Sequence, residues 1–104
     1  GSFEYFELES EVIVNAPNTF SLSQNYPNPF NPTTLIKFSI PVKGNVTLKV
    51  YDIIGNEVAT LVNENKDAGT FEVNFSAEDL SSGIYLYQLK SSSFIETKKM
   101  TLIK

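Results

Sequence analysis

The chain of 104 residues contains no cysteine, histidine, tryptophan or arginine. The absence of cysteine and of histidine excludes several kinds of functional site. Without cysteine there is no disulfide and no thiolate metal site, and no redox compartment is indicated. Without histidine the chain lacks the commonest general base and the commonest metal ligand. The net charge of −4 argues against nucleic-acid binding, because phosphate binding needs a concentrated cationic surface.

The remaining acidic and hydroxyl side chains show no catalytic or metal-binding pattern. Asp52, Asp67 and Asp79 stand at expected strand ends and turns without EF-hand spacing, so we interpret them as turn-forming, solvating groups. The serines have no histidine to activate them and no Gly-x-Ser-x-Gly motif. No apolar run approaches the ~20 residues of a membrane-spanning helix. We therefore expect no catalytic residue, metal site, cofactor or membrane insertion.

What the chain does contain is a series of short segments in which apolar and polar residues alternate. This period of two half-buries a strand. The alternating segments, or shorter apolar runs, are 20–22, 36–40, 46–50, 56–62 (an expected edge strand), 71–75, 84–89 and 94–104. Turn-forming residues separate them at 41–45, 54–56, 67–69 and 81–83. About seven strands at this spacing predict an all-β fold, an immunoglobulin-like β-sandwich of antiparallel strands.

Two local expectations concern residues near the strand ends. Tyr85 follows Gly83 closely and is expected to point inward and make a corner hydrogen bond to the backbone. Residues 76–80 are expected to form one helical turn that places Leu80 in the core.

The last segment contains an inconsistency in its alternation. Glu96 and Lys98 share the parity of the apolar residues around them. Either a β-bulge near residues 96–99 re-phases the strand, or its first half is exposed to solvent, and the bulge is the favoured interpretation. The lysines of this strand are also those that commonly guard a free sheet edge.

The composition divides the chain into two parts. Residues 1–19 are expected to be the tail of a preceding domain plus a linker, and residues 20–104 to form the sandwich domain. Residues 1–10 hold no basic residue and no apolar run, so no signal peptide is expected there.

Residues 24–32 read Gln-Asn-Tyr-Pro-Asn-Pro-Phe-Asn-Pro and hold three of the five prolines; we call them the proline segment. Each proline removes a backbone donor, and each pushes the preceding residue toward an extended conformation. The expectation is a stiff, polyproline-like lead-in that takes little part in a sheet ladder. Such a lead-in would act as a joint that holds the domain clear of whatever precedes it.

These motifs together resemble a known family. Residues 24–34 look like the opening of the type A C-terminal sorting domain of the type IX secretion system, which belongs to the Bacteroidetes and their relatives. The similarity continues, in order, through residues 50–58, 68–69, 80–85 and 96–100. It covers roughly residues 20–104, and it implies an immunoglobulin-like sandwich that serves as a folded address label.

The resemblance also implies partners and a location. The partners would be the outer-membrane secretion machinery, a surface sortase and an upstream cargo domain, and the cargo would pass through the periplasm to the cell surface or medium. Sortase cleavage would fall in residues 15–19. Recognition positions implied by the resemblance are Gly55, Gly83, Tyr85, Lys98, Lys99 and Lys104, and the structural motif of the proline segment comprises Pro27, Asn28, Pro29, Phe30 and Pro32.

Two further hypotheses compete with a sorting signal. An immunoglobulin-like accessory module for carbohydrate binding would need exposed, coplanar aromatic side chains, for which Tyr26, Tyr51 and Tyr87 are the candidates. A structural assembly module, as in the similar domains of flagellar hook-capping proteins, would self-associate.

Overall fold

The computed structural model describes residues 17–104, and this part of the chain is built of strands. Their bounds are β2 Ser21–Leu22, β3 Thr33–Ile40, β4 Gly44–Asp52, β5 Glu57–Lys66, β6 Gly69–Ser76, β7 Gly83–Ser91 and β8 Phe94–Leu102. Within residues 17–104 there is no helix that is long and apolar enough to cross a membrane.

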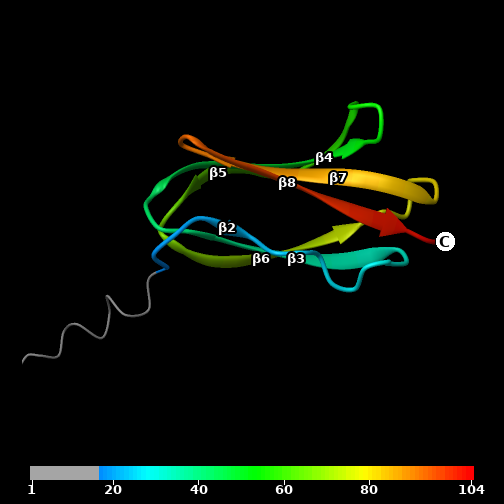
Figure 1. Cartoon of the computed structure of the whole chain (residues 1–104), viewed down its shortest axis with the longest axis horizontal. Coiled ribbons are helices and arrows are strands. Elements are labelled where there is room, and N and C mark those ends of the chain that lie inside the picture. Colours follow the sequence, from blue (N-terminus) through cyan, green and yellow to red (C-terminus); the bar gives the residue numbers. More distant parts are fainter. Residues whose placement is uncertain (1–16) are drawn as a thin grey trace, which may run out of the picture.

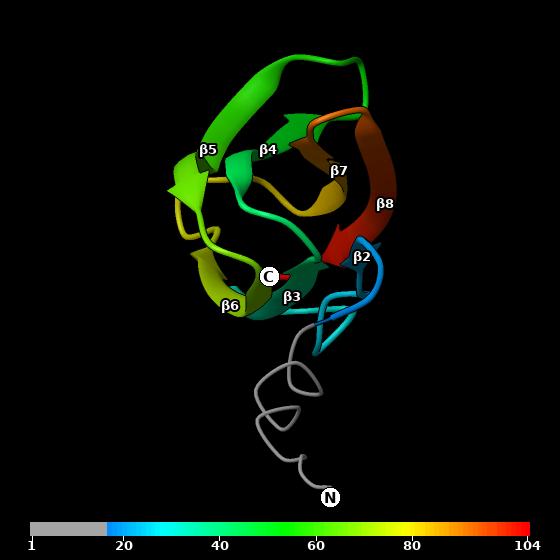
Figure 2. The ribbon, with the colours of Figure 1, turned by 90° about the vertical axis from the view of Figure 1, so that its left-hand side faces the viewer.

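The strands form two sheets that pack face to face (Figure 1). One sheet has the order β2-β3-β6 and the other the order β5-β4-β7-β8, and all strand pairs are antiparallel. Viewed along the strands, β2 lies beside β8, and β5 lies above β6 on the other side (Figure 2). This arrangement confirms the predicted immunoglobulin-like β-sandwich.

The alternating residues meet between the sheets, as the period of two predicted. The core is lined by Leu22, Phe30, Ile36, Phe38, Ile40, Val46, Leu48, Val50, Val62, Phe75, Ala77, Tyr85, Tyr87, Leu89, Met100 and Leu102. Removing this apolar surface from water is the main favourable term in folding. Because the core draws on every strand of both sheets, each strand is held by the others.

Strand β5 is an edge strand, as expected, but it is longer than the alternation indicated. It runs for ten residues along β4, and the register shifts twice, between Leu48 and Lys49 and between Val50 and Tyr51. Such irregularities twist an edge and protect it from pairing with another sheet. They also explain why the alternation in residues 56–62 was poor.

The predicted β-bulge near residues 96–99 is wrong. The β7–β8 register runs without a shift from the Gly83–Leu102 pair to the Ser91–Phe94 pair. Glu96 and Lys98 do share a face with Met100, but they are half-buried and form an ion pair with an N–O distance of 3.4 Å. The neighbouring strand β2 has only two residues, so the facing sheet is too narrow to cover the first half of β8.

The expected helical turn at residues 76–80 is also wrong. These residues form a tight turn, in which the Leu80 N–H donates to the Ala77 carbonyl at 3.1 Å. Ala77 is buried, and Leu80 packs against the core as expected. One turn is enough to carry the chain from β6 to the other sheet, so no helix is required.

We predict that truncating a buried isoleucine to alanine lowers the free energy of unfolding far more than the same truncation of an exposed isoleucine. Ile36→Ala should lower the free energy of unfolding by about 2–5 kcal/mol, because Ile36 is completely buried. Ile54→Ala, at an exposed position, should change it by less than about 0.5 kcal/mol. Urea unfolding followed by circular dichroism measures both, and equal costs would contradict the assigned core.

Candidate functional site

The proline segment connects β2 to β3 and is docked against the end of the last strand. The Phe30 N–H donates to the Thr101 carbonyl at 3.0 Å, and the Ile103 N–H donates to the Phe30 carbonyl at 2.9 Å. At its start, Tyr26 exchanges backbone hydrogen bonds with Leu35 of β3, at 3.0 and 2.9 Å. The expected free joint is therefore wrong, because the segment lies inside the domain and pairs with both sheets.

Side chains of the segment extend this contact along the edge of β8. The Asn28 Oδ1 atom accepts a hydrogen bond from the Thr101 N–H at 3.0 Å, and Gln24 Nε2 donates to the Lys99 carbonyl at 2.8 Å. An edge strand otherwise presents unpaired backbone groups. The backbone N–H groups that the prolines lack are not needed here, because the contacts with β8 use the backbone of Phe30 and the side chain of Asn28 rather than a continuous ladder of hydrogen bonds.

A buried polar network anchors the other end of the segment. The hydroxyl of Tyr87 donates to the Ser23 carbonyl at 2.7 Å and accepts from the Asn25 N–H at 2.8 Å. The Asn25 side chain is buried and donates to Thr34 Oγ1 at 3.0 Å and to the Pro27 carbonyl at 3.1 Å. A satisfied network of this kind fixes one conformation, because any broken bond leaves a buried group unpaired.

Phe30 adds an apolar contact to these hydrogen bonds. Its side chain is buried in the core, and its ring centroid lies 6.2 Å from that of Phe75. Of the five residues predicted as the structural motif, Phe30 fills the core with its ring and bonds the end of β8 with its backbone, and Asn28 bonds β8 with its side chain. Pro27, Pro29 and Pro32 shape the chain between these contacts, and the carbonyl of Pro32 accepts from the Ala77 N–H at 2.8 Å.

Tyr85 makes the predicted corner hydrogen bond. Its side chain is buried, and its hydroxyl donates to the Ser81 carbonyl at 2.7 Å. The bond ties the start of β7 to the turn that precedes it. A buried, satisfied hydroxyl is unavailable to a partner, so the role of Tyr85 in this structure is to hold the turn before Gly83.

Gly55 lies at the tip of the β4–β5 hairpin with a φ of 98°, a conformation that favours glycine. The Gly55 N–H donates to the Asp52 carbonyl at 3.0 Å. The Asp52 carboxylate accepts from the N–H groups of Asn56 and Ile54, at 2.9 and 3.1 Å, and from Asn56 Nδ2. The bond from the Asn56 backbone is the main cause that lowers the pKa of Asp52. The hairpin tip is thus a preformed turn.

The three lysines predicted for recognition occupy different surroundings. Lys98 lies half-buried beside Glu96, whereas Lys99 on the opposite face of β8 is exposed. The Lys104 backbone N–H donates to Ser82 Oγ at 2.9 Å, and its ammonium group donates to the Glu78 carbonyl. Of the three, Lys104 is therefore the one that is bonded to the turn before Gly83.

Most of the predicted positions meet at one end of the sandwich, which we call the distal end. It holds the β4–β5 hairpin, the turn before β7 and residues 103–104 (Figure 1). The proline segment reaches the same end through Phe30. The described chain begins at the opposite, proximal end, where Phe20 stacks on Phe94 at a centroid distance of 4.9 Å.

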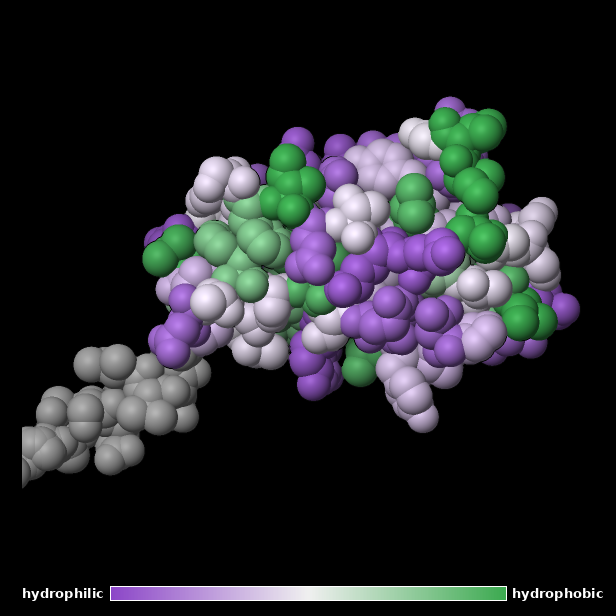
Figure 3. Space-filling view, viewed as in Figure 1, coloured by the Kyte–Doolittle hydropathy of each residue, from purple (hydrophilic) through white to green (hydrophobic). Residues whose placement is uncertain are grey.

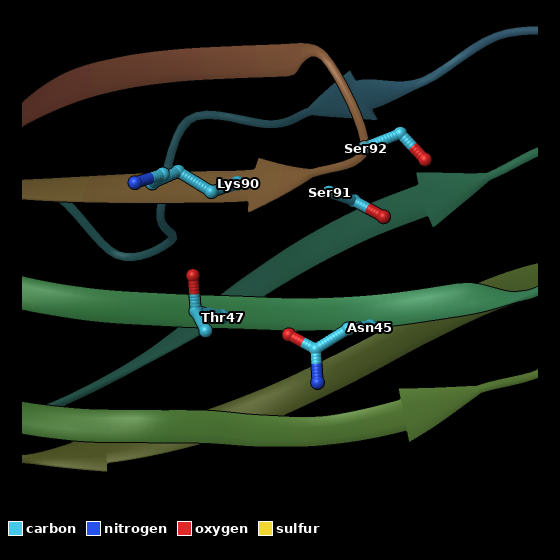
Figure 4. A pocket seen from close by; sticks show the side chains of 5 residues that line it. All are labelled: Asn45, Thr47, Lys90, Ser91 and Ser92. Atoms are coloured by element: carbon cyan, nitrogen blue, oxygen red, sulfur yellow. The ribbon is translucent and has the colours of Figure 1, made fainter.

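In the part of the chain that the structure describes, the three candidate tyrosines do not form the aromatic face that carbohydrate binding would need. Tyr87 is completely buried. The exposed Tyr26 pairs with β3 of one sheet, whereas the half-buried Tyr51 belongs to β4 of the other sheet. A shallow hollow of about 240 Å³ lies toward the proximal end, lined by Asn45, Thr47, Lys90, Ser91 and Ser92 (Figure 4). Its one cation points along the strand away from the serines, and no carboxylate lines it.

Within residues 17–104 no three acidic side chains come together in a way that could hold a metal ion. Sequence reasoning missed two features of the domain, one in the proline segment and one at the distal end. Nothing in the pattern indicated the burial of Asn25, which depends on tertiary contacts, although the inward parity of Tyr87 did imply a buried hydroxyl in need of partners. The exposed isoleucines around Gly55 were also overlooked, although the Ile-Ile-Gly order at a turn tip was visible.

Comparison with models of known protein families gives a match to this chain. A family model described as "Secretion system C-terminal sorting domain" matches residues 24–104. The match begins in the proline segment and ends on the last residues, the two stretches that the Phe30 contacts join. A search of curated proteins finds no match.

We predict that the Asn28 side chain protects the Thr101 amide. Asn28→Ala removes the acceptor, which should cost about 1 kcal/mol locally. Hydrogen exchange at Thr101 should then accelerate roughly fivefold, measured by NMR. Asn31→Ala is the matched control, because Asn31 is exposed and its side chain makes no hydrogen bond within residues 17–104. Unchanged exchange at Thr101 in Asn28→Ala would contradict the docking.

Burial raises the pKa of Tyr87 to about 12, which predicts a stability loss at high pH. The unfolded phenol ionises near pH ~10, so the folded state retains this proton longer. The contribution is complete below pH ~10 and is lost as pH rises through about 12. Urea unfolding across this range should show a shallower decline for Tyr87→Phe than for Tyr26→Phe. Equal slopes would refute the assignment.

Proposed function

The chain belongs to the family of secretion system C-terminal sorting domains, and from this premise we propose that it targets a larger cargo protein for export across the outer membrane by the type IX secretion system. Domains of this family are C-terminal sorting signals for type IX secretion and are generally non-catalytic. The cargo lies upstream of the domain, and the outer-membrane machinery reads the folded sandwich.

The observation that carries this proposal is the extent of the family match. It covers residues 24–104, so every strand except β2 falls within it. An address label must fold without help from its cargo, and this domain has its own core between two sheets. The docked proline segment supports the same role, because it holds the last strand in a defined position.

The positions of the proximal and distal ends also suit a sorting signal that is attached to a cargo protein. The described chain starts at the proximal end, so a cargo in front of it would be joined there, and the distal end would point away from it. We propose that residues 1–19 are the tail of the preceding domain plus a linker, and that a surface sortase cuts in residues 15–19. The cargo is then attached to the cell surface or released into the medium.

The assigned recognition positions divide into two groups. Tyr85 and the two glycines shape the turns, and Lys99 and Lys104 supply exposed charge, whereas Lys98 is half-buried beside Glu96. We propose that the machinery reads the surface these turns display rather than the buried tyrosine. Carbohydrate binding and structural assembly are left without a specific observation in their favour.

The test is a fusion of the whole 104-residue chain behind a reporter that carries a separate export signal. In a host with a type IX system the reporter should reach the cell surface or medium, and in the same host without the system it should stay in the periplasm. A reporter without the chain is the control. Export that does not depend on the system would defeat the proposal.

Deleting residues 98–104 is a poor substitute for this test. Met100 and Leu102 are buried in the core, so the deletion unfolds the domain as well as removing its lysines. Point changes at exposed positions keep the two effects apart.

A further inference from the structure

Four exposed isoleucines gather at the distal end of the β5-β4-β7-β8 sheet. Their exposed fractions are 68 % for Ile53, 81 % for Ile54, 38 % for Ile84 and 53 % for Ile103. Isoleucine is among the residue types most often found inside proteins, and single exposed ones need no explanation. Four of them at the ends of three neighbouring strands form a patch, which we call the distal patch.

The strand register shows why these side chains are neighbours. Asp52 pairs with Tyr85, and because Tyr85 points into the core, Ile84 beside it points out of the sandwich. Ile53 follows Asp52 directly, at the first position of the hairpin turn, which places it toward the start of β7 where Ile84 stands. On the other side Ile84 pairs with Thr101 of β8. Ile103 lies two residues further, just past the end of β8, and has the same parity as Thr101. Figure 3 shows apolar side chains at this end of the molecule, over the hairpin.

The turns of the distal end are rigid for a surface feature. The Asp52 carboxylate and the Gly55 backbone fix the hairpin that carries Ile53 and Ile54. The Phe30 carbonyl accepts from the N–H of Ile103 and fixes its backbone. A preformed apolar surface loses little conformational entropy on binding, so it is suited to recognition.

The outward face of this sheet differs in the sign of its charge from the chain as a whole, and the carboxylate at the hairpin turn, that of Asp52, is bound by N–H groups of its own turn. The outward-facing positions of this sheet hold Lys49, Lys90, Lys99 and one glutamate, Glu57, which pairs with Lys49 at 3.3 Å. Of these outward-facing lysines Lys99 is the nearest to the patch, because its partner Leu86 is two residues from Ile84 on the same face. Lys104 follows Ile103, and its ammonium group is bonded to the Glu78 carbonyl. This face is therefore cationic, although the net charge of the chain is −4.

We propose that the distal patch is the docking surface for the outer-membrane receptor, and that the receptor offers an apolar recess rimmed by carboxylates. This inference rests on the proposed function and adds the surface and the chemistry of the partner. The proline segment, Tyr85 and the glycine turns present the patch, and the four isoleucines with Lys99 make the contact.

Two other occupants fit the observations less well. A second copy of the chain needs about 800 Å² on each partner, whereas four partly exposed isoleucines present only a few hundred Å², on the order of the largest patch of an ordinary monomer. An anionic membrane attracts clusters of roughly four to eight basic residues, and interfacial helices and aromatic belts strengthen such binding. This face has three lysines, and the chain has no tryptophan.

The test compares two double variants of the whole chain in the reporter fusion. Ile53→Thr with Ile54→Thr removes half of the distal patch while keeping β-branched side chains. Val42→Thr with Ile95→Thr is the matched control, because these residues are 55 % and 58 % exposed and lie at the proximal end. Export of the distal variant should fall roughly tenfold, since a few buried apolar contacts carry most of an interface. The control should be exported like the original chain.

A charge variant tests the contribution of the lysine beside the distal patch independently. Lys99→Glu should also reduce export severalfold, and circular dichroism should show both variants folded. Export of the folded distal variant at the original level would overturn the inference and leave the proposed function standing. Failure of the unaltered chain to direct export would instead remove the proposed function and the inference with it.

Measurements on the purified chain distinguish the other occupants. Sedimentation should show a monomer, and vesicles of phosphatidylglycerol should not bind it. A dimer that dissociates in the distal variant would assign the patch to a second copy. Vesicle binding that the distal variant loses would assign it to a lipid surface. Either result would overturn the inference.

Discussion

The contact between Phe30 and the end of β8 is the constraint on which the rest of this domain depends. Among the strands of residues 17–104, the last one lies at the edge of the four-stranded sheet, where no further described strand pairs with its outward backbone groups. The proline segment supplies partners through the Phe30 backbone and the Asn28 side chain, and it inserts the Phe30 ring into the core at the same place. The proline segment thus provides hydrogen-bond partners for the edge strand β8 and fills a position in the core.

This contact separates residues that build the domain from residues that are available to a partner. Tyr85, Tyr87 and Asn25 are buried and fully engaged, and they hold the proline segment and the turn before β7. The exposed side chains at the distal end include the four isoleucines and Lys104, with Lys99 next to them on β8. A sorting signal works on unrelated cargo proteins, so its readable surface must be held by the domain alone, and these buried contacts provide that support.

The strands and their inward faces could be predicted from the alternation, because the pleat itself sets a period of two. The alternation does not report how wide the opposite sheet is. For this reason Glu96 and Lys98 suggested a bulge, whereas they lie half-exposed beyond the two-residue strand β2. The prolines suggested a free joint for a similar reason, since local stiffness says nothing about docking. Asn25 carried no signal at all, because its burial arises from Tyr87, 62 residues further along the chain.

The most direct test of the contact between Phe30 and the end of β8 is an NMR study of the isotopically labelled chain. The account predicts nuclear Overhauser contacts between Phe30 and Leu102, together with slow hydrogen exchange at the amides of Phe30 and Ile103. A proline segment without contacts to β8, with both amides exchanging as fast as in an unfolded chain, would contradict it.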